Sequence, residues 1–251
     1  MSLSTFGLIS GITCTLIVFT AAVIGLILLK AYSRSHSSQT LGLSLFILFM
    51  GSPWLGSAIN FILAVVGASF LDDVPYVMLT SFWVFGSLAA IQVTSTILLP
   101  SWEKRLVISF GVISVVQAFA IFILVPLGVI DVNKVYDLNK TAGNLPEGSY
   151  AGVFIGLVGI TVITVIICGI FFIVNALMTE IPLIKARSTP LGIGMIIYAL
   201  FAVIDGAFSI KSEPLLIYIR FMVLLSLLLI YVGITLPSFI FARWGIEKPP
   251  K

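Results

Sequence analysis

The sequence predicts an all-α polytopic membrane protein with seven transmembrane helices. Three observations support this class: 60% of the 251 residues are hydrophobic, only 9% are charged, and the mean hydropathy is +1.22. Soluble domains have about 45–50% apolar and about 25% charged residues, so the composition excludes that class. The net charge of +3 is small and its basic residues fall in short loops, so we expect the lipid bilayer and no nucleic acid as a partner.

Seven apolar segments are long enough to cross a bilayer, which takes about 20 residues in a helix. The first segment is too long for a signal-peptide core and lacks a small-residue cleavage pattern, so we expect it to be retained. Short loops join the segments, which predicts a single seven-helix domain over residues 1–251. The expected spans are 6–30, 41–67, 76–99, 106–130, 152–178, 190–210 and 214–241.

Prolines predict bends in three of these spans. In the second span, "MGSPWLGS" places Pro53 two residues after Gly51, a combination at which membrane helices kink. We interpret this kink as a fixed shape rather than a hinge, with Trp54 placed where it would line the floor of an outer pocket. Pro126 and Pro237 predict weaker bends near the ends of the fourth and seventh spans.

The distribution of Lys and Arg predicts the orientation in the membrane. Nine basic residues fall on one side and three on the other, so the positive-inside rule places the C-terminus in the cytoplasm and the N-terminus outside. We expect the cell membrane as the location. The side with nine has Lys30, Arg34, Lys104, Arg105, Lys185, Arg187, Arg243, Lys248 and Lys251, and the side with three has Lys134, Lys140 and Lys211.

The longest predicted loop, residues 131–151, is external in this orientation. It contains the tripeptide Asn-Lys-Thr at Asn139, which matches the acceptor pattern for N-linked glycosylation. Because such tripeptides are common by chance, a glycosylated and an unmodified Asn139 both stay open.

The first three spans resemble the last three in the same order. "GLISGITCTLIVF" from Gly7 is similar to "GLVGITVITVIICGIFF" from Gly156, and "TLGLSLFILFMGSPWLGSA" from Thr40 aligns with "PLGIGMIIYALFAVIDGA" from Pro190. A gapped match relates the third span to the seventh. The fourth span then joins two copies that cross the membrane in the same direction, which predicts a parallel three-plus-one-plus-three repeat.

Two charged residues, Asp205 and Arg220, lie inside the sixth and seventh spans. The midpoint of their positions falls in the short turn between the spans, so an antiparallel hairpin brings them to nearly equal depth, about 10 Å of helix rise from the turn. Charges within spans are rare, and they pair or line a water-filled cavity. Three interpretations stay open: a structural pin, part of a ligand or switch site, and an Arg220 that extends to the outer headgroups.

Polar side chains in other spans extend this candidate site. Asn60 and Gln117 are predicted in the outer half of the membrane, at the level of the charged pair. Amides in membrane helices most often bond across helix interfaces for packing alone. If these side chains face the bundle interior, the ligand or switch site comprises Asp205, Arg220, Asn60, Trp54 and Gln117.

The sequence lacks the patterns of common membrane enzymes. The single histidine, His36, falls in a predicted cytoplasmic loop, which excludes a bis-histidine haem within the chain and a zinc centre of the usual ligand types. One intramembrane aspartate makes no carboxylate dyad, and the serines in the spans have no histidine to activate them. The last span has no lysine for a retinal Schiff base. We therefore expect no enzyme activity, no metal and no cofactor.

The seven spans, the external N-terminus, the repeat and the ending "LLIYVGITLPSFIFARW" resemble the seven-helix sensor modules at the N-termini of prokaryotic signalling proteins. The topology is also similar to that of microbial rhodopsins, without their retinal lysine. The resemblance implies that the protein senses a small ligand outside and changes conformation inside. Those modules usually carry an output domain, whereas this chain stops at "GIEKPPK", so a sensor here would signal through a separate membrane or cytoplasmic partner.

Two other classes of function stay open. Seven-helix sugar transporters share the three-plus-one-plus-three plan, but "SRSHSSQT" lacks the proline usual near their first intracellular loop. An accessory subunit of a membrane complex would fit the short loops and the lack of obvious chemistry. A sensor needs a pocket open only outward around Asp205 and Arg220, a transporter needs a path to both sides, and a subunit needs a face that packs on another protein.

Overall fold

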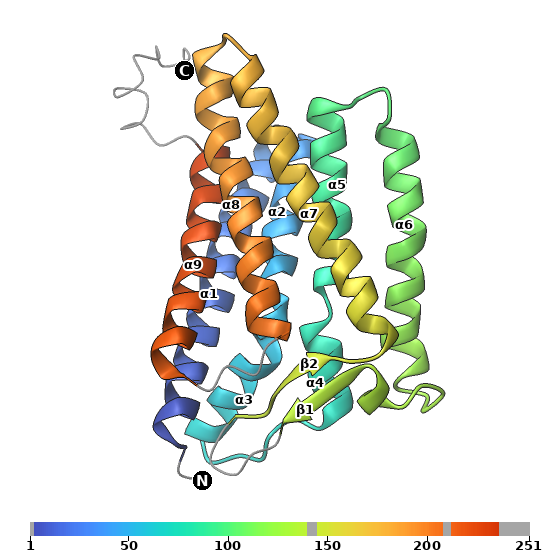
Figure 1. Cartoon of the computed structure of the whole chain (residues 1–251), viewed down its shortest axis with the longest axis vertical. Helices are drawn as coiled ribbons and strands as arrows, with labels where there is room; N and C mark the ends of the chain where they lie inside the picture. The colour runs from blue at the N-terminus through green and yellow to red at the C-terminus, as the bar shows by residue number, and fades with distance from the viewer. Residues whose placement is uncertain (1–2, 140–144, 208–211, 236–251) are drawn as a thin grey trace.

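The computed structural model describes residues 3–139, 145–207 and 212–235, and its helices confirm a predominantly helical, multi-pass membrane protein (Figure 1). Seven helices within these ranges are long and apolar enough to cross a membrane, as the sequence predicts. They span Thr5–Ser35, Ser38–Val65, Asp73–Leu98, Glu103–Leu124, Val153–Met178, Pro182–Gly206 and Glu213–Thr235.

Four spans are single α-helices: α1 (Thr5–Ser35), α7 (Val153–Met178), α8 (Pro182–Ala207) and α9 (Glu213–Thr235). The sixth span begins earlier than residue 190, because Pro182 occupies the first helical position, where its missing N–H costs no hydrogen bond. The helix then continues through Pro190. Lys185 and Arg187 therefore lie on helical turns rather than in a loop. The predicted end of the seventh span, with Pro237, lies outside the described residues.

The other three spans are interrupted. The second consists of α2 (Ser38–Met50), the 3₁₀ turn η1 (Ser52–Trp54) and α3 (Leu55–Val65), so the break predicted at Pro53 is confirmed. The third was expected to be continuous but is divided at Ser81 and Phe82 into α4 (Asp73–Thr80) and α5 (Trp83–Leu98). The fourth consists of α6 (Glu103–Phe119) and the π-helical turn η2 (Ala120–Leu124), and it ends before residue 130 because Pro126 cannot continue the ladder.

The predicted external loop contains two short strands that the sequence analysis missed. After the 3₁₀ turn η3 (Val132–Lys134), β1 (Tyr136–Asn139) pairs antiparallel with β2 (Glu147–Tyr150), which places Tyr136 opposite Tyr150. The strands lie across the end of the bundle at which α7 begins (Figure 1). Residues 140 and 141 of the glycosylation tripeptide lie outside the described residues, so that expectation stays a prediction.

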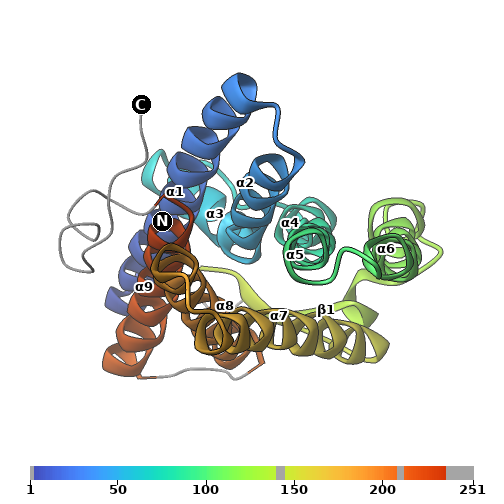
Figure 2. The ribbon, with the colours of Figure 1, turned by 90° about the horizontal axis from the view of Figure 1, so that it is seen from above.

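The helices form two rows when the bundle is seen from its end (Figure 2). One row contains α1, α2 with α3, α5 with α4, and α6; the other contains α9, α8 and α7. Contacts of α1 with α9 and of α5 with α7 join the rows. The fourth span lies at the edge, because its most apolar window is only 17% buried against 61% for the third span.

Small residues allow α7 and α8 to touch backbone to backbone at one point. A Cβ added to Gly192 would lie 2.6 Å from the carbonyl oxygen of Gly169, and one added to Gly169 would lie 2.8 Å from the carbonyl oxygen of Gly192. Close approach at small residues is the usual way in which membrane helices gain packing energy. This crossing fixes the spacing of the two helices.

Replacing Gly192 with Ala should therefore destabilise the protein by about 1–3 kcal/mol, because the new methyl group meets a backbone oxygen that cannot rotate away. Thermal unfolding of the detergent-purified protein measures the effect. Gly111→Ala on α6 is the matched control, since its Cβ would meet nothing within 4 Å. Equal melting temperatures for the two variants would contradict the close crossing.

Candidate functional site

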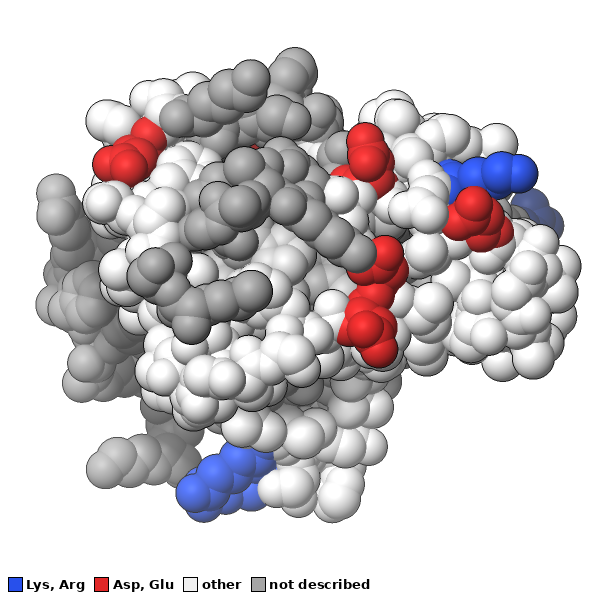
Figure 3. All heavy atoms as spheres, turned by 90° about the horizontal axis from the view of Figure 1, so that it is seen from below, with Lys and Arg blue, Asp and Glu red and all other residues white. Residues whose placement is uncertain are grey.

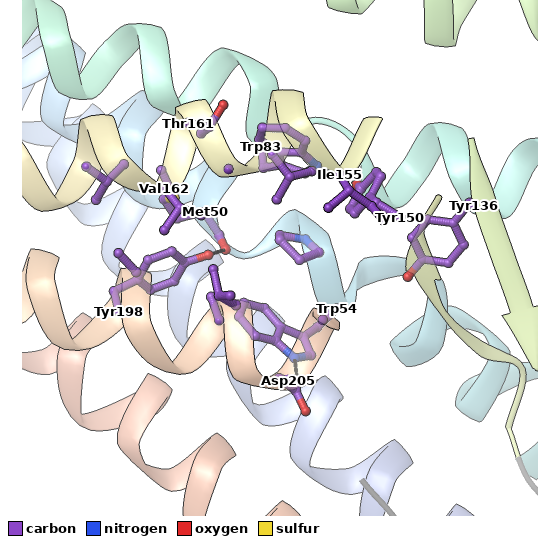
Figure 4. Close-up of a pocket in the computed structure, with 18 of the residues that line it drawn as sticks. Met50, Trp54, Trp83, Tyr136, Tyr150, Ile155, Thr161, Val162, Tyr198 and Asp205 are labelled. Carbon is purple, nitrogen blue, oxygen red and sulfur yellow. Dashed lines mark hydrogen bonds between the residues drawn. The ribbon is translucent and has the colours of Figure 1, made fainter. Parts of the chain in front are cut away.

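A cavity of about 500 Å³ lies between α7 and α8 in the half of the bundle near the strands (Figure 4). Its walls come from the second, third, fifth and sixth spans and from both strands, with Arg220 added by α9. Aromatic side chains that also carry a polar atom line much of it. They are Trp54, Tyr76, Trp83, Tyr136, Tyr150 and Tyr198.

The break in the second span positions one side of this cavity. In a regular helix the N–H of Trp54 would bond to the carbonyl of Met50, but in the 3₁₀ turn it bonds to the carbonyl of Gly51. The carbonyl of Met50 therefore stays available and accepts a hydrogen bond from the hydroxyl of Tyr198 at 2.5 Å. The ring of Tyr198 in turn packs edge-on against Trp54. A helix break thus joins the second span to the sixth.

Asp205 and Arg220 meet at the edge of the cavity, as predicted. The Nε of Arg220 lies 3.2 Å from Oδ2 of Asp205, and their side chains are only 4% and 6% exposed. Trp54 Nε1 donates to the same Oδ2 at 2.5 Å. Arg220 Nη1 donates to the carbonyl of Ser10 at 2.9 Å, to its hydroxyl at 2.7 Å and to the hydroxyl of Thr13 at 3.0 Å. These contacts form a polar network, Trp54–Asp205–Arg220–Ser10–Thr13, shared by the first, second, sixth and seventh spans.

The network excludes one of the three interpretations of Arg220. An arginine that extends to the headgroups would be exposed, whereas this guanidinium is buried and directed at α1 and α8, so that interpretation is wrong. The structural pin and the ligand or switch site both stay open. They do not exclude one another, because Asp205 and Arg220 belong to the network and also line the cavity.

Asn60 and Gln117, which the sequence analysis added to the site, lie elsewhere. Both are buried, but neither lines the cavity. Asn60 Oδ1 accepts the N–H of Leu71 at 2.8 Å and so holds the connection between α3 and α4. The Nδ2 of Asn60 and the Nε2 of Gln117 have no hydrogen-bond partner among the residues that the structure describes. Equal depth in the membrane did not imply a shared cavity.

The strands close the end of the cavity through Tyr150. Its hydroxyl bonds to Trp83 Nε1, lies 3.3 Å from the hydroxyl of Ser81 and donates to the carbonyl of Thr80 at 3.4 Å. The break in the third span makes that carbonyl available, since the N–H of Val84 bonds to Ser81 instead. Burial raises the pKa of Tyr150 to about 12.

Apart from Trp54, sequence reasoning missed the aromatic lining, although two signals were present. Tyr198 precedes Asp205 by seven residues, which is two helical turns and therefore the same face of α8. Tyr136 and Tyr150 stand near the two ends of the predicted external loop, which hinted at a tethered loop. Tyr136 and Tyr150 both reach the cavity because β1 pairs with β2, and the residue pattern of a single span cannot predict that pairing.

Neither the family models nor the curated proteins compared with this chain give a match. The cavity and the polar network beside it are therefore the features from which a function is inferred.

Removing the guanidinium should show how much the network stabilises the fold. Arg220→Ala leaves the Asp205 carboxylate buried without its ion partner, and we expect a loss of about 3–5 kcal/mol in the free energy of unfolding. The exchange Asp205→Arg with Arg220→Asp should recover part of that loss, because a charge pair is restored while the bonds to Ser10 and Thr13 are not. Unfolding in detergent measures both, and an unchanged Arg220→Ala protein would contradict a stabilising network.

Tyr150→Phe should lower stability at pH 8 by about 1 kcal/mol, because its hydroxyl bonds to Trp83 and Thr80 are lost. The pKa of about 12 in the folded protein exceeds the ordinary value of 10.0. The unfolded chain therefore releases this proton first, and the stability of the wild type should fall as the pH rises from 10 to 12. The variant should lose less over this interval. Melting temperatures across the interval test this, and parallel curves for the two proteins would contradict it.

Proposed function

We propose that this protein is a seven-helix, receptor-like membrane protein that binds a small neutral ligand in the cavity and signals through a separate partner. The observation that carries the proposal is that Asp205 lines the cavity and also belongs to the network shared by four spans. A ligand that contacts Asp205 therefore acts on the interaction that holds those spans together.

The lining supports a neutral ligand with an apolar body and a hydrogen-bonding group. Among the described lining residues the two charged side chains, Asp205 and Arg220, neutralise each other. Indole and phenol rings offer flat apolar faces with polar edges. The volume of about 500 Å³ falls within the range of about 300–1,000 Å³ that small-molecule sites occupy.

Coupling to an output would follow from differential binding. A ligand shifts a conformational equilibrium only as far as it prefers one state over the other. The network provides such a difference, because Trp54 and Arg220 both contact Asp205 Oδ2, and a ligand hydrogen-bonded to this carboxylate competes with them. The resulting change would reach α1 through Ser10 and Thr13.

The orientation and the cell-membrane location are part of the proposal. The cavity lies near the end with the strands, which the positive-inside rule places outside. Acidic side chains are exposed at several points on this end of the bundle (Figure 3). The cavity would then open on the outer half of the membrane, and α1, α7 and α8 would present their other ends to a cytoplasmic or membrane partner.

A solute transporter is the second candidate, and the arrangement of the rows supports it. The first three spans run along one row and the last three along the other in opposite order, as a two-fold axis along the membrane normal would place a repeated unit. A transporter also needs a path to both sides of the membrane. The crossing of Gly169 with Gly192 and the buried side chains beyond it instead favour a pocket that opens at one end, as the receptor proposal requires.

The test is the thermal stability of the purified protein against a library of small neutral compounds. A ligand at 100 times its Kd should stabilise the wild type by about 2.7 kcal/mol, because it binds the folded state preferentially. Trp54→Phe should enlarge this response at the same ligand concentration, since it removes the indole that competes with the ligand for Asp205 Oδ2.

The matched control is Trp102→Phe, an exposed indole outside the cavity, which should keep the wild-type response. Equal stabilisation of both variants would place the ligand elsewhere and contradict the proposal. Uptake of the same compound into proteoliposomes would favour the transporter instead, and a library without any stabilising compound would count against a small-ligand receptor.

A further inference from the structure

The cavity has a lateral opening between α7 and α8. The two helices touch at Gly169 and Gly192 and separate toward the strands (Figure 1). Gly159, about 15 Å further along α7, and Gly206 near the end of α8 both line the cavity, and a Cβ at either would meet nothing within 4 Å. The pair of helices therefore forms a V whose closed end is the glycine crossing and whose open end is the mouth of the cavity.

The rim of this opening belongs to the lipid-facing surface. Ile155 and Ile163 line the cavity and are also 58% and 59% exposed. Both lie within the fifth span, where an exposed apolar side chain on the outside of the bundle faces acyl chains. The strands, held by Tyr150, lie across the end that faces water (Figure 1). The bilayer thus reaches the mouth more directly than the aqueous phase does.

The chemistry of the cavity changes from the mouth to its inner end. Near the mouth, α7 and α8 contribute the aliphatic side chains of Ile155, Val158 and Val203. The inner end is the side of the cavity toward the second span, where Trp54 and Asp205 meet (Figure 4). Among the described residues Asp205 Oδ1 accepts only one long hydrogen bond, from Arg220 Nε at 3.4 Å, so it can accept a stronger one from a hydroxyl group.

We propose that the occupant is a neutral, hydroxyl-bearing, single-chain lipid that enters from the bilayer between α7 and α8. This inference rests on the receptor proposal and names its ligand class. The acyl chain would lie along the aliphatic side chains of the mouth, and a headgroup hydroxyl would donate to Asp205. A free fatty acid would not fit, because its carboxylate would stand beside that of Asp205 with the Arg220 guanidinium already committed.

The experiment uses the full chain in nanodiscs and a monoacylglycerol with a brominated acyl chain as the probe. Bromine quenches nearby indoles, and Trp54 and Trp83 both line the cavity. Trp102→Phe and Trp244→Phe are introduced first, so that the fluorescence comes only from Trp54 and Trp83. Quenching should saturate with probe concentration and be reversed by the unbrominated monoacylglycerol, but not by a fatty acid of the same chain length.

Gly159→Phe places a ring in the mouth and should raise the apparent Kd for the probe by about tenfold or more. Gly156→Phe is the matched control: its position is equally open, lies three residues away on the same helix and does not line the cavity. It should bind as the parent does. Gly206→Leu obstructs the mouth from α8 and repeats the test should Gly159→Phe fail to fold.

Quenching that rises linearly with probe and is equal in Gly159→Phe and Gly156→Phe would overturn the lipid proposal. If a water-soluble neutral compound still stabilised the protein in a Trp54-dependent manner, the receptor proposal would stand with a different ligand class. If neither class bound, both proposals would fail.

Discussion

The ion pair between Arg220 and Asp205 is the constraint on which the arrangement of the bundle depends. A charge in hydrocarbon is tolerated only with partners, and one carboxylate does not satisfy a guanidinium. Ser10 and Thr13 supply acceptors from the first span, and Trp54 satisfies the carboxylate from the second. The need to satisfy two buried charges therefore determines which helix faces turn toward one another at this depth.

Two helix breaks contribute to the cavity by the same physical means. Each makes one backbone carbonyl available at membrane depth, and each carbonyl accepts a hydrogen bond from a tyrosine of a distant segment: Met50 from Tyr198, and Thr80 from Tyr150. Irregular backbone within a membrane protein persists only where it is satisfied internally or lines a cavity, and here both carbonyls are satisfied internally while Met50 also lines the cavity. The breaks and the aromatic lining are two aspects of one arrangement.

The sequence predicted those features that depend on local pattern alone. Hydropathy predicted seven spans, helix rise placed Asp205 beside Arg220, and Pro53 indicated the first break. The break at Ser81 and Phe82 has no proline to indicate it. It is stabilised by Tyr150, which lies on a strand that only the folded protein brings near, so no local pattern could predict it. Asn60 and Gln117 illustrate the same limit, since helix rise gives depth in the membrane and says nothing about which way a side chain points.

The bond from Arg220 to Ser10 joins residues 210 positions apart in the chain. Because synthesis proceeds from the N-terminus, Ser10, Trp54 and Asp205 enter the membrane before the arginine that unites them. Until α9 arrives, the Asp205 carboxyl group has no cation beside it, and an unpaired charge in lipid is costly. Completion of the bundle therefore depends on insertion of the seventh span, which brings the cation partner of Asp205 and joins the first span to the sixth.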